Sequence, residues 1–217
     1  MKNIKFGRLK EFDLRSRGYS IRALIGVGAK PRSYTWRCTL QLDQGSTPAC
    51  TGFSVTHEAA ARPVEVPNLT NATALKIYKR AQVLDDFPGT DYEGSSVLGA
   101  VKAGMEKKWY GSYRWAFGEA DLALAVGYKG PVILGVDWYS GMMEPDSKGI
   151  IEPTGTLEGG HAILCVGVNL KTGLYRLHNS WGQSFGINGD CFMLRDDMDW
   201  LLRQEGEACI PIARGQG

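Results

Sequence analysis

The sequence predicts an α+β fold with two unlike halves, and three observations support this prediction. Segments with apolar residues at helical spacing lie mostly in the first half of the chain, whereas short apolar runs typical of β-strands dominate the second half. Gly, Pro and Asn residues separate these runs, as turns would. With 217 residues, 43% of them hydrophobic, the chain can bury a substantial core. We therefore expect one domain over residues 1–217, with a mainly helical lobe at about 1–110, a mainly β lobe at about 111–217 and a cleft between them.

The first predicted helix covers residues 50–62. This segment is rich in alanine, has no internal proline and ends before Pro63, while Pro48 suits a helix start. The other predicted helices cover residues 72–83, 96–107 and 119–126. Ser95 or Ser96 is expected to cap the third helix, because a side-chain oxygen at that place accepts a hydrogen bond from a backbone N–H of the first turn.

Apolar runs bounded by turn residues predict strands over residues 132–138, 162–168, 174–179 and 191–194. The first thirty residues mix Arg, Gly and Ser with scattered apolar positions, so we expect little regular structure there. The sequence leaves three roles open for this part of the chain: an arm, an autoinhibitory strap or a strip that docks a partner.

Composition excludes several classes of function. The net charge is +2, from 25 basic and 23 acidic residues, and this balance does not favour binding to nucleic acid or to an anionic membrane. No apolar run follows the basic start of the chain, and no stretch approaches the roughly 20 apolar residues of a membrane span. We expect a cytoplasmic protein, although delivery with a virion or by a secretion system stays open, and the oligomeric state is not predicted.

The five cysteines are widely spaced and form no Cys-x-x-Cys pair. A structural zinc site is therefore not expected, and we predict no metal and no cofactor. Cys165 and Cys191 lie in apolar runs and are expected to be buried strand residues. Reduced thiols are the expected state, because no secretory signal is recognised.

Four residues together suit acyl transfer through a thioester. Cys50 lies at the expected helix start, where the partial positive charge of the helix favours a thiolate. His161 can serve as the base, Asn179 can orient its imidazole, and the amide of Gln44 can donate a hydrogen bond to an oxyanion. The neighbouring histidines, His57 and His178, are interpreted as structural.

Three motifs then resemble those of papain-like cysteine peptidases. They are Gln-Gly-Ser-x-x-x-Cys at residues 44–50, Gly-His-Ala at residues 160–162 and Asn-Ser-Trp-Gly at residues 179–182. The resemblance implies a papain-like two-lobed fold and a thiol protease that hydrolyses peptide bonds. It also indicates a compact bacterial or viral type without the long pro-segment of the secreted members.

The resemblance assigns roles residue by residue. It makes Cys50 the nucleophile, His161 the general acid and base, Asn179 the residue that orients His161, and Gln44 an oxyanion-hole donor. Trp181 would shield the hydrogen bond between His161 and Asn179 from water.

The resemblance also implies a substrate-binding surface. Gly94 and Ser95 align with a strip that pairs with the substrate backbone. Gly135 and Gly160 would border the pocket for the second substrate residue before the scissile bond. Trp138 and Tyr139 are interpreted as packing residues, and a subsite role for them stays open.

Two residues depart from the family pattern. Thr47 stands where the family commonly has a disulfide-bonded cysteine, and Thr51 replaces the usual aromatic residue after the nucleophile. The leading hypothesis is an endopeptidase acting on a peptide or protein. The alternatives are a hydrolase that removes an amide- or ester-linked modifier, and an inactive papain-like domain that serves as a binding or structural module.

Overall fold

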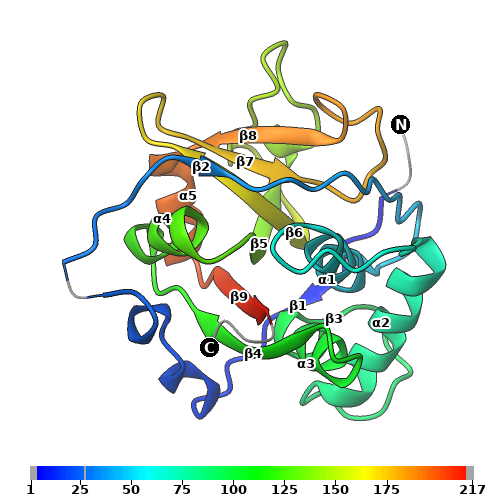
Figure 1. The fold of residues 1–217 in the computed structure, drawn as a ribbon. Helices are drawn as coiled ribbons and strands as arrows, with labels where there is room; N and C mark the ends of the chain where they lie inside the picture. Colours follow the sequence, from blue (N-terminus) through cyan, green and yellow to red (C-terminus); the bar gives the residue numbers. More distant parts are fainter. Residues whose placement is uncertain (1–3, 27, 214–217) are drawn as a thin grey trace.

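The computed structural model describes residues 4–26 and 28–213. Figure 1 shows a group of helices on one side of the molecule and a twisted sheet on the other. The helical group consists of α1 (Cys50–Ala60), α2 (Asn71–Leu84) and α3 (Val97–Glu106), which pack against one another. The helices predicted in this part of the chain are therefore confirmed, with shifts of one or two residues at their ends.

Side-chain caps explain where two of these helices begin. Thr70 caps α2, and its hydroxyl accepts a hydrogen bond from the Thr73 backbone N–H. Ser96 caps α3 in the same way, with 2.8 Å between its hydroxyl and the Gly99 N–H. Each cap satisfies a donor that the first turn of a helix leaves without a partner.

The described residues form a seven-stranded sheet whose strand pairs are all antiparallel. Its main path runs, in spatial order, through β4 (Tyr110–Trp115), β9 (Glu207–Ala213), β5 (Val132–Tyr139), β6 (Leu157–Asn169), β7 (Leu174–His178) and β8 (Asp190–Leu194). The short strand β2 (Tyr34–Thr35) pairs with β6 outside this path. The four predicted strands correspond to β5, β6, β7 and β8, whereas β4 and β9 were not predicted.

Two further helices, α4 (Glu119–Tyr128) and α5 (Arg195–Arg203), pack on the sheet. The prediction of a helix over residues 119–126 is confirmed by α4, while α5 was not predicted. No described helix combines the length and the apolar character that crossing a membrane requires.

Two hydrophobic clusters meet at β6. One cluster lies between the sheet and helices α4 and α5 and includes Ile163 and Cys165. The other lies between the sheet and helices α1 to α3 and includes Ala162 and Leu164. This division follows from the alternation of side chains along a strand. The strand that carries His161 is thus held from both sides.

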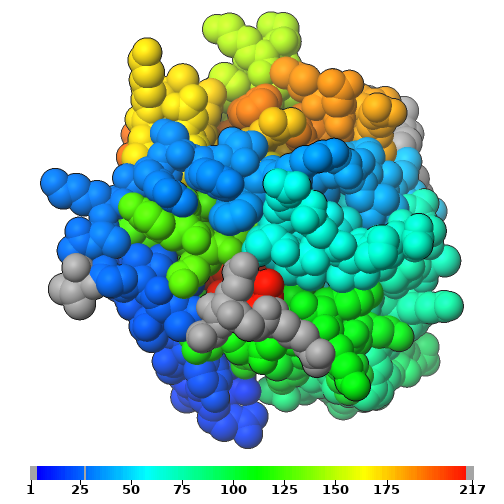
Figure 2. Space-filling model, in the orientation of Figure 1, coloured from blue at the N-terminus to red at the C-terminus, as the bar shows by residue number. Residues whose placement is uncertain are grey.

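The first part of the chain has little regular structure, as predicted. It contains β1 (Arg8–Leu9) and two short 3-10 turns, Ser16–Gly18 and Ile21–Ala23. In Figure 2 a light-blue band of residues 30–45 then crosses the visible face, with the yellow and orange strands β7 and β8 above it and the cyan α1 region below it. This crossing brings the chain to the start of α1.

Candidate active site

Cys50 is the first residue of α1 and is fully buried. The helix begins there because Ala49 has left the helical conformation, and no side chain caps this end. The free N–H groups and the dipole of the first turn therefore favour negative charge near the thiol. The backbone N–H of Ala162 on β6 faces the sulfur. This contact brings the strand residue next to His161 against the start of α1.

His161 is held by Asn179 in one tautomer. The Asn179 side-chain oxygen lies 2.9 Å from His161 Nε2 and also accepts the backbone N–H of Ser180 at 2.8 Å. Because that oxygen accepts only, Nε2 must carry the proton and donate it. Nδ1 of a neutral His161 is then a free acceptor, and it has no hydrogen-bond partner among the residues that the structure describes.

Aromatic rings exclude water from the hydrogen bond between His161 and Asn179. The ring centroids of Trp138 and Trp181 lie 4.7 Å and 5.0 Å from that of His161. Trp181 is only 3% exposed and Trp138 is fully buried. The Trp181 ring lies where it would shield the His161–Asn179 hydrogen bond from water, and Trp138 packs beside Trp181, with 5.3 Å between their ring centroids.

Burial determines the charge states of Cys50 and His161 in this structure. It raises the pKa of the Cys50 thiol, against the backbone N–H groups of Ala162 and Gly7 and the charge of Arg8. Burial also lowers the pKa of His161 to about 4, against the hydrogen bond to Asn179. Both shifts favour a neutral thiol beside a neutral imidazole while the site is covered.

The Gln44 side chain is fixed by three hydrogen bonds. Its oxygen accepts the Ser180 hydroxyl at 2.7 Å, and its Nε2 donates to the carbonyl oxygens of Thr47 at 2.8 Å and Lys5 at 3.0 Å. The first two contacts are made within the site. The second N–H of the Gln44 amide donates to Lys5, a residue from the start of the chain, at the place where an external carbonyl could accept the same bond.

Residues 5–10, called the covering segment below, lie across the site. Figure 1 shows β1 beside α1, and its residues Arg8–Leu9 pair in parallel with Ser95–Ser96 of β3. The Phe6 ring lies 6.0 Å from the His161 ring in an edge-on arrangement. Of the three roles that the sequence left open for the first thirty residues, the geometry of this segment fits the autoinhibitory strap.

The predicted substrate-binding glycines all contact the covering segment. The Gly7 carbonyl accepts the Ser95 N–H at 2.8 Å, and the Gly7 N–H donates to the Gly160 carbonyl at 3.1 Å. A Cβ added at Gly94 would lie 2.7 Å from the Gly7 oxygen, and one added at Gly160 would lie 2.3 Å from the Arg8 oxygen. Residues without side chains therefore allow an extended backbone to approach here.

Gly135 lies at the wall of a pocket that the Arg8 side chain fills. A Cβ at Gly135 would lie 2.8 Å from a Val97 methyl group and 2.9 Å from Arg8 Nε. Sequence reasoning missed the acidic end of this pocket, formed by Glu207 and Asp137. An isolated carboxylate at the start of the apolar run over residues 207–213 was the available signal.

The two departures from the family pattern have local explanations. Thr51 and Ser95 share a hydrogen bond of 2.5 Å between their hydroxyls, which ties the start of α1 to β3. The Thr47 hydroxyl donates to the Gln44 carbonyl at 2.6 Å. All five cysteines are free thiols, so hydrogen bonds stabilise this loop without a disulfide.

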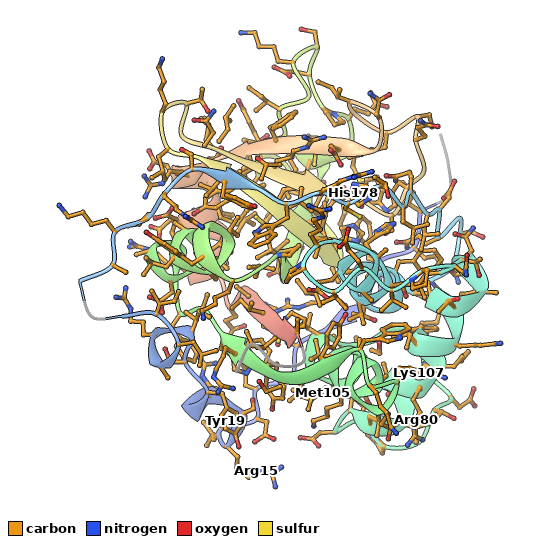
Figure 3. All side chains as sticks on the ribbon, in the orientation of Figure 1. Arg15, Tyr19, Arg80, Met105, Lys107 and His178 are labelled. Atoms are coloured by element: carbon orange, nitrogen blue, oxygen red, sulfur yellow. The ribbon has the colours of Figure 1, made fainter. Side chains whose placement is uncertain are left out.

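The other two histidines form a separate pair away from Cys50, and Figure 3 labels His178 on the sheet side. His57 Nε2 accepts the Leu42 N–H at 3.0 Å, and burial lowers its pKa well below the usual value. Burial also acts against protonation of His178, but the hydrogen bonds and charges of Asp190 and Cys38 together outweigh it and raise the pKa of His178 to about 10. His178 also donates to the Leu40 carbonyl at 2.8 Å. These contacts agree with the structural reading of both residues.

Within residues 4–26 and 28–213, no group of three or more His, Cys, Asp or Glu side chains could hold a metal ion. The chemistry available at the site is that of the thiol, the imidazole and the amides around them. An α+β fold that sets a helix-start cysteine against the strand bearing a His–Asn pair defines a cysteine peptidase of the papain-like class.

The chain belongs to the papain family of cysteine proteases, whose family model matches residues 71–209. It is therefore a cysteine peptidase, and it acts on peptides or proteins. The matched part includes His161 and Asn179 and begins after Gln44 and Cys50. A search of curated protein sequences gave no match.

Solved structures confirm the papain-like fold. Xylellain, a cysteine protease from Xylella fastidiosa, superposes with a TM-score of 0.74 at 19% identity, covering 98% of this chain and 97% of that chain. Procathepsin L2 from Tenebrio molitor gives a TM-score of 0.62 at 20% identity, covering 98% and 79%. Bromelain from Ananas comosus, solved with the E64 inhibitor, gives 0.62 at 17% identity, covering 85% and 100%.

Proposed function

We propose that this peptidase is an endopeptidase that cleaves peptide bonds through a thioester on Cys50. The observation that carries the proposal is the path of the covering segment. An extended chain passes the Gln44 amide at Lys5, the Cys50 sulfur at Gly7 and the pocket at Arg8, with Ile4 described on one side of these contacts and Leu9 and Lys10 on the other. A site that accepts a continuous chain in this way suits cleavage inside a polypeptide rather than at its end.

The first half of the reaction uses the tautomer that Asn179 imposes. Nδ1 of His161 takes the thiol proton of Cys50, and the sulfur attacks the substrate carbonyl carbon. The carbonyl π electrons move onto oxygen, where the Gln44 amide and the Cys50 backbone N–H donate hydrogen bonds. The C–N bond then breaks, and the proton on His161 passes to the leaving amine.

The second half regenerates the enzyme. A water molecule attacks the thioester carbon while Nδ1 of His161 accepts its proton. The C–S bond breaks, the carboxylic acid leaves, and the proton returns to the Cys50 sulfur. Throughout, Asn179 keeps Nε2 of His161 protonated, so the imidazole exchanges protons only at Nδ1.

Substrate can enter only when the covering segment has moved away. The segment occupies the Gln44 donor, the Gly160 carbonyl and the Ser95 N–H, which are the groups proposed to hold a substrate backbone. Its departure also admits water to the site. Hydration weakens the effect of burial on the pKa values of Cys50 and His161, which now favours the neutral form of both groups. The open form should therefore be the reactive one.

Alkylation by a thiol-directed epoxide tests the proposal, with mass spectrometry of the modified peptides as the readout. Wild-type protein should be modified at Cys50, and Cys50→Ala should lose both this modification and peptide hydrolysis. Cys38→Ala is the matched control, because Cys38 is partly exposed and lies outside the site. It should keep both activities.

The His161→Ala variant shows whether the imidazole activates Cys50 or whether the thiol is only accessible to the reagent. Without the imidazole, alkylation of Cys50 at neutral pH should become slow and should rise with pH as an ordinary thiol does. If His161→Ala reacts as fast as the wild type, the proposed role of His161 is wrong. If Cys50→Ala still hydrolyses peptides, the proposed nucleophile is wrong.

A further inference from the structure

The covering segment inserts one long side chain, that of Arg8, into a pocket built entirely by other parts of the chain. Gly135 on β5 forms one wall and Val97 of α3 contacts it. Glu207 is the first residue of β9 and lies directly opposite Gly135 in the strand register. The Arg8 side chain is fully buried there. The pocket therefore has a depth suited to an extended side chain.

The deep end of the pocket is acidic and fits a guanidinium group. Arg8 Nε and Nη2 donate to the same Glu207 oxygen at 2.9 Å and 2.7 Å, and Nη2 also donates to the Glu205 carbonyl at 2.9 Å. Nη1 lies 3.5 Å from Asp137 Oδ1. Asp137 follows Gly135 by two positions on β5, so both residues share one face of the strand.

Among the contacts described, the carboxylates of Glu207 and Asp137 pair only with cations of the covering segment. Glu207 pairs with Arg8, and Asp137 pairs with Arg8 and with Lys10 at 3.1 Å. When the segment leaves, the pocket keeps two acidic groups and loses its cations. Burial raises the pKa of Glu207 to about 7, and the charge of Arg8 acts in the opposite direction. A bound cation thus favours the charged form of this carboxyl group.

We propose that Glu207, assisted by Asp137, makes this pocket a specificity subsite for arginine, with Arg8 as its internal occupant. The preferred substrate would carry arginine as the second residue before the scissile bond, the position expected to reach the wall at Gly135. This inference rests on the proposed function, because it names the substrate class of the same site.

The contacts also predict an order of preference among the substrate side chains that could enter the pocket. Arginine can reproduce all of the hydrogen bonds that Arg8 makes, because its donors are fixed in a plane. Lysine can pair with Glu207 as a point charge but cannot also reach the Glu205 carbonyl in the same geometry. Leucine leaves the buried carboxylate without a partner, and glutamate adds a like charge. The expected order is arginine, lysine, leucine and then glutamate.

The test uses peptide amides with a fluorogenic leaving group that differ only at the second residue before the scissile bond. They are assayed in an Arg8→Ala protein, where the internal occupant is gone. The ratio of kcat/KM for the arginine peptide to that for the leucine peptide should exceed 10. Glu207→Gln, which keeps the size of the side chain, should lower this ratio by about 10- to 100-fold.

The ratio is the right readout because any shift that Glu207→Gln causes between the covered and open forms changes the rates on all peptides together. Glu106→Gln is the matched control: Glu106 is an exposed carboxylate that pairs with Arg80 of α2, which Figure 3 labels, and it makes no contact with Arg8, Glu207 or Asp137 among the contacts described. It should leave the ratio unchanged. If the leucine peptide is cleaved as well as the arginine peptide, or if Glu207→Gln leaves the ratio as it was, the pair only anchors the segment and the inference is wrong.

A binding measurement tests the arginine pocket independently of the proposed catalytic role of Cys50. In a Cys50→Ala, Arg8→Ala protein, calorimetry compares the binding of the arginine and leucine peptides without any catalysis. Tighter binding of the arginine peptide, abolished by Glu207→Gln, supports the pocket even if no peptide is hydrolysed. Equal binding overturns the pocket even if Cys50 proves to be the nucleophile.

Discussion

Replacing Arg8 by alanine should open the active site. The Arg8 guanidinium is buried and bonds to Glu207 Oε2 at 2.9 Å and 2.7 Å and to the Glu205 carbonyl at 2.9 Å. Removing one partner of a buried ion pair costs about 3–5 kcal/mol. The covered form bears this cost, because both charges are hydrated once the segment has left. The alanine substitution therefore shifts the balance between covered and open forms toward the open one.

The size of the shift follows from these contacts. A tenfold change in a population ratio corresponds to about 1.4 kcal/mol, so the full cost would change the ratio of open to covered protein by about 100- to 4,000-fold. Burial already raises the pKa of Glu207 to about 7, and proton uptake by Glu207 relieves part of the cost. We expect the lower end of that range, an increase of about 100-fold in the open fraction.

Alkylation of Cys50 by iodoacetamide measures the open fraction, provided that opening and closing are faster than the chemical step. The second-order rate at Cys50 should rise by about 100-fold in Arg8→Ala and by less in Arg8→Lys, which keeps the charge. Arg15→Ala is the control, because the Arg15 side chain is 86% exposed and pairs with Asp13 outside the site. Equal rates in Arg8→Ala and the wild type would refute the conclusion that this segment limits access.

Three further predictions concern the groups around Cys50 and the core beneath them. Gln44→Ala should lower kcat by about 10²–10³ in steady-state assays, because its amide is the proposed oxyanion donor, and an unchanged kcat would exclude that role. Asn179→Ala should lower kcat at least about tenfold with little change in KM, because Nε2 of His161 loses its acceptor at 2.9 Å; a change in KM alone would point to substrate binding instead. Burial raises the pKa of Glu58 to about 8 from 4.5, so the folded protein holds a proton that the unfolded chain releases between these values. The free energy of unfolding should therefore fall with rising pH across that window by about 1.4 kcal/mol per pH unit more in the wild type than in Glu58→Gln, as measured by urea unfolding at several pH values. Parallel pH profiles would show that Glu58 titrates normally.

The four candidate site residues could be proposed from the sequence because the chemistry of acyl transfer restricts which residues can stand at each position. Gln44, Cys50, His161 and Asn179 each lie in a short motif of the kind that this chemistry requires. Similarly, the first three helices were predictable from apolar spacing and from caps such as Ser96. These features depend on residues close together in the sequence.

Other elements were missed although a signal was present. In α5 the apolar residues Met198, Leu201 and Leu202 are buried on one face, at the spacing of an amphipathic helix. In β9 a proline at position 211 argues against a central strand, and β9 pairs with β5 only over residues 207–209. Pro211 itself pairs with β4 alone, so the apolar run over residues 207–213 was compatible with a strand.

The covering segment could not be predicted from local sequence. Its position depends on the pairing of Arg8 with Ser95 and on the ion pair with Glu207, partners that are far away in the chain. Nothing in residues 5–10 alone distinguishes a strap from an arm. The pocket for Arg8 likewise forms only when β5, β9 and α3 come together.

Trapping the acyl-enzyme shows whether the reaction passes through a thioester on Cys50. The Arg8→Ala protein is mixed with a peptide ester, quenched in acid within the first turnover and digested for mass spectrometry. The peptide containing Cys50 should gain the mass of the acyl group, and this product should be absent in Cys50→Ala and should not accumulate in His161→Ala. Turnover of the ester with no acyl group on Cys50, or equal turnover by Cys50→Ala, would contradict this mechanism.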